Sequence, residues 1–241
     1  MADHIVRSFD GQLKRLNESI ARMGGLAEAE LAACLQARQR RDAALAERTV
    51  ESDRAVDAME REIDEQAIEL LALRQPMASD LRVVVGSLRI AGDLERIADY
   101  AKNVAKRVVA LTQLAPVEPA LAIPRMGRFV QEMLKDVLDA FANRDVARAQ
   151  AVWSRDAELD AMHASLFREL LTLMMEDPRN VTPCTHLLFV AKNLERAGDH
   201  CTNIAEMVHY LVTGRPLVEA RRKDDAANFA VRGIDRQTGE R

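Results

Sequence analysis

The chain has 241 residues, of which 48% are hydrophobic and 4% are aromatic, and its acidic residues (38) outnumber its basic residues (34) to give a net charge of −4. This length corresponds to one or two domains, and the low aromatic content disfavours an all-β fold. The acidic balance argues against general nucleic-acid binding, which needs excess basic charge to neutralise phosphates.

The first part of the chain predicts three helices. Residues 5–40 carry apolar side chains at helical spacing, and Asp42 then suits the N-cap of a second helix. Residues 43–74 contain no glycine or proline, and Pro76 prevents this helix from continuing. A third helix is expected from Ser79 or Asp80 to about residue 111.

A second set of three helices follows a linker that contains three prolines. Pro124 opens the first of these helices, and residues 143–145 form a turn. Asp177-Pro178 ends the second helix, and Thr182-Pro183 begins the third, with the proline at its first turn. We therefore divide the chain into a first unit (1–114), a linker (115–124), a second unit (125–219) and a polar tail expected to be disordered (220–241).

The two units are copies of one another. Met23-Gly24 aligns with Met126-Gly127 at an offset of 103 residues, and this register holds through Met59 and Met162. In the third helix the offset becomes 100, and six of the thirteen positions in 93–105 are identical to those in 193–205. The sequence therefore predicts an all-α fold of two tandem, pseudo-symmetric, elongated three-helix bundles.

Composition also predicts the compartment. The three cysteines, Cys34, Cys184 and Cys201, are far apart and form no CxxC pair, which argues against a disulfide framework or a structural zinc site. The first ten residues carry early charges without an apolar core typical of a signal peptide. No apolar run approaches the roughly 18 residues of a membrane span. We therefore expect a cytoplasmic protein without membrane insertion.

Both third helices carry a Glu-x-x-x-Asp-x-x-x-Asn pattern, whose members share one helix face. Helical angles place this face on the flank and outside of the bundle, and the second helices carry a similar acidic edge. The candidate metal ligands are Glu95, Asp99, Asp53 and Asp57 in the first unit and Glu195, Asp199, Asp156 and Asp160 in the second. Clustered carboxylates repel one another, and a hard cation such as Mg²⁺, Ca²⁺, Mn²⁺ or iron would remove the repulsion.

Two other interpretations of these residues stay open. In the first, the carboxylates are solvated surface groups, with Lys102 and Arg96 pairing with Asp99 and its neighbours. Alternatively, Glu206-x-x-His209 and the looser Asp160-x-x-His163 would belong to a ferritin-like di-metal enzyme, although Lys106 stands where the repeat would need a second Glu206. His200, beside Asp199, is a candidate extra ligand or a surface histidine. The chain shows no phosphate-binding loop and no catalytic triad pattern.

The repeated third-helix motif resembles that of the PhoU family of phosphate-signalling regulators. The motif reads LERIADYAKNVA over residues 94–105 and LERAGDHCTNIA over residues 194–205. The segments PMASDLR (76–82) and YLVTGRP (210–216) are also similar to family segments, and the resemblance covers about residues 5–218. Ala98 departs from the glycine usual in the motif, which is present at Gly198.

The resemblance implies a non-enzymatic, cytoplasmic homodimer that represses the phosphate-starvation response. Such a protein couples a phosphate ABC transporter, through its ATPase, to a membrane sensor histidine kinase, and modulates phosphate uptake at the inner membrane. The resemblance also implies that the acidic motifs bind divalent or iron-type metal ions, with Mg, Mn, Fe and Zn left open. It implies no nucleic-acid partner and no function for the tail.

Overall fold

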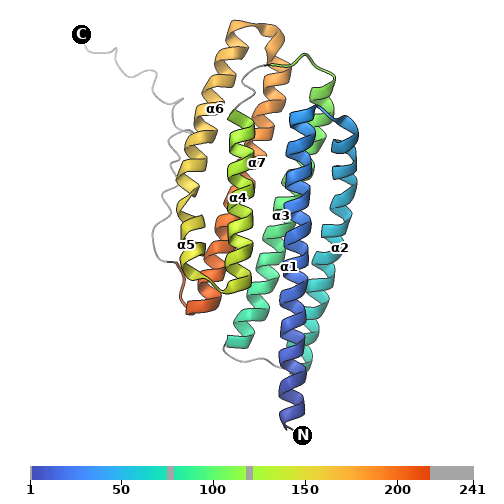
Figure 1. Cartoon of the computed structure of the whole chain (residues 1–241), viewed down its shortest axis with the longest axis vertical. Helices are drawn as coiled ribbons and strands as arrows, with labels where there is room; N and C mark the ends of the chain where they lie inside the picture. The colour runs from blue at the N-terminus through green and yellow to red at the C-terminus, as the bar shows by residue number, and fades with distance from the viewer. Residues whose placement is uncertain (1, 75–78, 118–121, 218–241) are drawn as a thin grey trace, which may run out of the picture.

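The computed structural model describes residues 2–74, 79–117 and 122–217 and is all-α, as predicted (Figure 1). The helices of the first unit are α1 (Ala2–Arg40), α2 (Ala43–Arg74) and α3 (Ser79–Thr112). Those of the second unit are α4 (Ala122–Asn143), α5 (Val146–Ser154), α6 (Asp156–Glu176), the short 3₁₀ helix η1 (Pro178–Asn180) and α7 (Val181–Thr213). No strand occurs among these described residues.

The two units lie side by side, and their third helices form the centre of the molecule. Figure 1 shows α3 and α7 running in opposite directions along the long axis, with α1 and α2 on one side and α4 to α6 on the other. The most extensive contact between any two helices is that of α3 with α7. Ile97 and Ala101 of α3 and Ile204 of α7 all belong to one continuous apolar core. The two repeats therefore share a core.

The contact between α1 and α4 obeys the same repeat symmetry. A Cβ atom on Gly24 would collide with the Leu138 side chain, and one on Gly127 would collide with Leu35. Gly24 aligns with Gly127, and Leu35 aligns with Leu138. Each unit therefore supplies one glycine that admits the leucine of the other, which lets the two helices approach closely.

The turn between the first two helices is also the same in both units. Asp42 Oδ1 accepts a hydrogen bond from the Leu45 amide (2.9 Å), and Asp145 Oδ1 accepts one from the Arg148 amide (3.0 Å). Asp42 therefore acts as the predicted N-cap. Arg41 and Arg144, the preceding residues, both adopt left-handed backbone conformations with φ of 53°.

Three boundaries differ from the prediction. Helix α4 begins at Ala122, so the last three residues of the predicted 115–124 linker are helical. Pro124 is tolerated there because the first-turn N–H groups of a helix have no intrahelical partner. The predicted second helix of the second unit is broken at Arg155, whose side chain bonds Asp136 of α4 (2.9 Å). Helix α7 begins at Val181, two residues before Pro183. The predicted tail, 220–241, lies outside the described residues.

Candidate functional site

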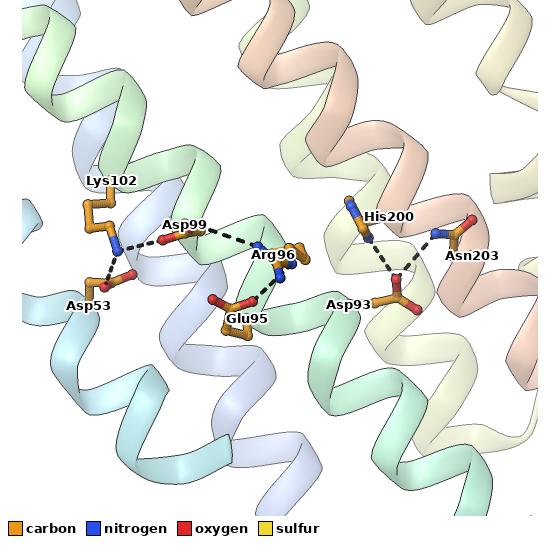
Figure 2. Close-up of polar contacts among 8 residues, drawn as sticks. All are labelled: Asp53, Asp93, Glu95, Arg96, Asp99, Lys102, His200 and Asn203. Carbon is orange, nitrogen blue, oxygen red and sulfur yellow. Dashed lines mark hydrogen bonds and ion pairs between the residues drawn. The ribbon is translucent and has the colours of Figure 1, made fainter. Parts of the chain in front are cut away.

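The acidic edge of the first unit consists of Asp53 and Asp57 of α2 and Glu95 and Asp99 of α3, and a lysine lies within it. Lys102 Nζ lies 2.7 Å from Asp53 Oδ2 and 2.5 Å from Asp99 Oδ1, and so joins α2 to α3 (Figure 2). Burial by itself would lower the pKa of Lys102, but the hydrogen bonds and charges of the two aspartates raise it overall. The ammonium therefore stays charged and neutralises this pair of carboxylates.

Arg96 neutralises the remaining carboxylates of the motif. Its Nε lies 3.4 Å from Glu95 Oε2, and its Nη1 lies 4.0 Å from Asp99 Oδ2 (Figure 2). Burial raises the pKa of Glu95, an effect that Arg96 opposes and the charges of Asp99, Glu60 and Asp57 reinforce. Burial also raises the pKa of Glu60, with the charges of neighbouring aspartates adding to it. Asp57 thus belongs to the same acidic edge.

Sequence reasoning missed Glu30, the most buried carboxyl of this edge. Glu30 of α1 is 4% exposed, and its Oε2 atom is buried without a hydrogen-bond partner among the described residues. Burial and then the charge of Asp53 raise its pKa to about 7, although Ser52 and Lys102 oppose this shift. The sequence could have indicated that Glu30 is buried. Position 30 falls on the apolar stripe of α1, and Met133 occupies the equivalent position of α4.

The structure corrects the expected exposure of these carboxylates. Asp53 is 5% exposed, and the side chains of Glu95 and Asp99 are 19% and 29% exposed, so the edge is a half-buried seam rather than an outer face. The prediction of an outer face was wrong because the helical angles described α3 alone, whereas α2 packs along the flank of α3.

The arrangement does not fit a metal ion as it stands. Among the described residues, no group of three or more acidic, histidine or cysteine side chains is placed to hold one. In the first unit, Lys102 takes the place between Asp53 and Asp99 where the sequence suggested a cation. Metal binding by the eight predicted ligands therefore stays a prediction.

The acidic edge of the second unit has different neighbours. Position 202, equivalent to Lys102, is a threonine, and position 163, equivalent to Glu60, is a histidine. Burial lowers the pKa of His163, and the charge of Glu195 opposes this shift. Glu195 itself lies 2.6 Å from Lys192 Nζ. The remaining predicted ligands of this unit, Asp156, Asp160 and Asp199, are buried or half-buried.

His200 is a half-buried histidine that contacts a carboxylate of the other unit. Its Nδ1 lies 2.7 Å from Asp93 Oδ1, which also accepts a hydrogen bond from Asn203 Nδ2 (3.2 Å; Figure 2). Asp93 belongs to α3, so these bonds join the two units. Asp93 was not among the predicted site residues, because the sequence alone gives no signal that α3 and α7 cross at this point.

The residues of the ferritin-like alternative have other partners. Glu206 Oε1 accepts a hydrogen bond from Trp153 Nε1 (3.0 Å), and His209 Nδ1 lies 3.0 Å from the Arg215 carbonyl oxygen. These two side chains therefore stabilise packing near the end of α7.

The described helices also include none that is long and apolar enough to cross a membrane.

Comparison with known proteins identifies the repeat. A family model described as the PhoU domain matches the chain twice, over residues 20–108 and 123–208. The chain belongs to the PhoU family. The two matches correspond to the two repeats, α1 to α3 and α4 to α7.

Two bacterial relatives show how far this similarity extends. Over 226 residues, the chain is 50% identical to the phosphate-specific transport system accessory protein PhoU homolog of Caulobacter vibrioides, covering 93% of this chain and 98% of that protein. It is 51% identical over 223 residues to the protein of the same name from Rhizobium meliloti, covering 92% and 94% of the two chains.

Solved PhoU structures have the same architecture. The PhoU crystal structure from Pseudomonas aeruginosa superposes with a TM-score of 0.83 at 38% identity, covering 86% of this chain and all (100%) of that one. The phosphate transport system regulatory protein PhoU from Streptococcus pneumoniae gives a TM-score of 0.80 at 30% identity, covering 87% and 99%.

Proposed function

We propose that this PhoU protein is a non-enzymatic negative regulator of the phosphate-starvation response. It couples a phosphate ABC transporter to a membrane sensor histidine kinase and modulates phosphate uptake. The observation that carries the proposal is the 50% identity to accessory proteins of a phosphate-specific transport system over nearly their whole length. The protein acts as a cytoplasmic homodimer, held near the inner membrane by its partners.

The pairing of polar groups supports a role in binding rather than catalysis. Lys102 is held between Asp53 and Asp99, and Asp93 is held by His200 and Asn203. Such pairs fix the positions of neighbouring helices. General acid–base catalysis needs a side chain aimed at a substrate within a cleft instead.

Exposed apolar side chains support contact with a protein partner. Ile68 and Leu73 near the end of α2 are 63% and 66% exposed, and Met175 near the end of α6 is 78% exposed. The ends of α2 and α6 are equivalent in the repeat, and Figure 1 shows them at opposite ends of the molecule. Apolar groups gathered at a surface commonly mark interaction sites.

The regulatory role is tested by deletion of the gene. A deletion strain grown with plentiful phosphate should express its phosphate-scavenging genes, and complementation by the wild-type chain should repress them again. Continued repression in the deletion strain would contradict the proposed role.

The partners are tested separately by crosslinking in phosphate-replete cells. The transporter ATPase and the sensor kinase should be recovered with the wild-type protein. A variant with I68D and L73D should recover less of both while keeping its helical content. Equal recovery of both partners would show that the α2 end is not their contact surface, and recovery of neither would contradict the coupling role.

A further inference from the structure

A pocket of about 150 Å³ lies where the two units meet, at the end of α1. It is enclosed by the last turns of α1 and α3, by residues 115–117 and by the first turns of α7. Its floor is apolar, with Val108, Leu111 and Leu187, and its charged groups are Arg38 and Arg41. The space is enough for several water molecules or for a compact ion, since one water occupies about 30 Å³.

Arg38 is half-buried beside this pocket, and Arg41 is the charged neighbour that acts on it. Its Nε is buried and donates no hydrogen bond among the described residues. Burial and then the charge of Arg41 lower the pKa of Arg38, so the neighbouring charge that acts on it has the same sign. Partial burial of a cation away from an opposite charge is costly, and such groups are normally paired. Arg38 and Arg41 make this pocket electropositive, which favours an anionic ligand.

Arg41 is held in place at the edge of the same pocket. Its Nη2 donates to the carbonyl oxygens of Leu111 (2.8 Å) and Leu114 (2.7 Å) at the end of α3. These bonds use one terminal nitrogen and leave the Nη1 and Nε hydrogens to other acceptors.

The second unit contains the equivalent pocket without the second arginine. This pocket, of about 250 Å³, is lined by Phe141, Arg144, Val208 and Leu211, which align with Arg38, Arg41, Val108 and Leu111. Lys14 and Glu18 of α1 also line it, and they form an ion pair with each other (3.8 Å). The fold therefore accepts a phenylalanine at the position of Arg38. Because the same fold stands without it, Arg38 is not required to build the pocket, and its presence calls for another explanation.

We propose that the pocket beside Arg38 and Arg41 binds a small oxyanion, with inorganic phosphate as the fitting ligand. Two guanidinium groups match the charge of a dianion, and their planar donors form paired hydrogen bonds with oxyanion oxygens. A bound dianion compensates the burial of Arg38 and its repulsion by Arg41. This site goes beyond the proposed regulatory role and rests on the pocket, its two arginines and the unpartnered Nε of Arg38.

The test measures binding of radiolabelled inorganic phosphate to the full chain by equilibrium dialysis at constant ionic strength. R38F installs the residue found at position 141 and should weaken phosphate binding at least tenfold. R15F removes one exposed arginine from the same helix, about 35 Å away at 1.5 Å per residue, and should bind like the wild type. Sulfate should compete with phosphate, whereas chloride should not.

Thermal unfolding gives a second readout that also checks folding. Phosphate should raise the unfolding midpoint of the wild type and of R15F, because a ligand that binds only the folded state stabilises it. In chloride, R38F should unfold cooperatively, and phosphate should leave its midpoint unchanged. Equal phosphate binding by R38F and the wild type would overturn the proposal, as would equal competition by chloride.

Two further experiments test whether the anion comes from another source than a free ion. Glu118 follows Val117 in the sequence, so E118Q tests whether this carboxylate already supplies the anion. Phosphate binding by E118Q but not by the wild type would overturn the proposal of a free ion. Phosphoserine tests a phosphoryl group attached to a larger molecule, and tighter binding of phosphoserine than of inorganic phosphate would also overturn it.

Discussion

Replacing Glu30 by methionine should stabilise the protein above pH 7 and have little effect near pH 5. Burial raises the pKa of Glu30 from 4.5 to about 7, so the folded state holds a proton that the unfolded state releases between these values. The folded state therefore loses stability as pH rises through this interval. One proton changes the free energy of unfolding by about 1.4 kcal/mol per pH unit, which gives about 3 kcal/mol over the interval.

The repeat supplies the replacement for this experiment. Met133 fills the equivalent position of the second unit and is fully buried, so methionine suits this helix and this core. We expect E30M to gain up to about 3 kcal/mol at pH 8, measured by urea unfolding at pH 5, 6, 7 and 8. E30Q keeps the shape of the side chain and should remove the same pH dependence.

The difference between E30M and the wild type is the informative quantity. Glu60 and Glu95 also have raised pKa values, but both proteins retain them, and their effects cancel in the difference. A difference in free energy of unfolding that is the same at pH 5 and pH 8 would refute the reasoning. It would show that Glu30 ionises in the folded protein as readily as in the unfolded chain.

Three other substitutions test the contacts between and within the repeats. D93N, which installs the residue of position 193, should weaken the bridge to His200 and cost about 1 to 2 kcal/mol at pH 6 by urea unfolding; no cost would show that the bridge is dispensable. G198A should cost about 1 kcal/mol because the new methyl group collides with Leu159, and L159V should recover it in a double-mutant cycle, since valine and alanine (Val56 and Ala98) occupy the equivalent positions of the first unit. K102M should raise Mn²⁺ uptake, measured by elemental analysis, because it frees two carboxylates of the first unit; unchanged uptake would count against a metal site there.

The sequence by itself determined the helices, the duplication and the family. The helices depend on neighbours within about four residues, as the apolar stripe of each helix and the Asp42 cap show. The repeat motif in each third helix likewise needs no knowledge of what packs against it. Local interactions of this kind leave a direct trace in residue order.

The tertiary structure alone decided which charged groups meet between helices. The pairing of Lys102 with Asp99, one turn away on α3, could be read from the sequence, whereas only the packing of α2 on α3 adds Asp53. The Asp93–His200 contact depends in the same way on where α3 crosses α7. Burial of Glu30 and the break at Arg155 also follow from neighbouring helices. Distances between helices are set by the packing of the whole core, and residue order along one helix does not encode them.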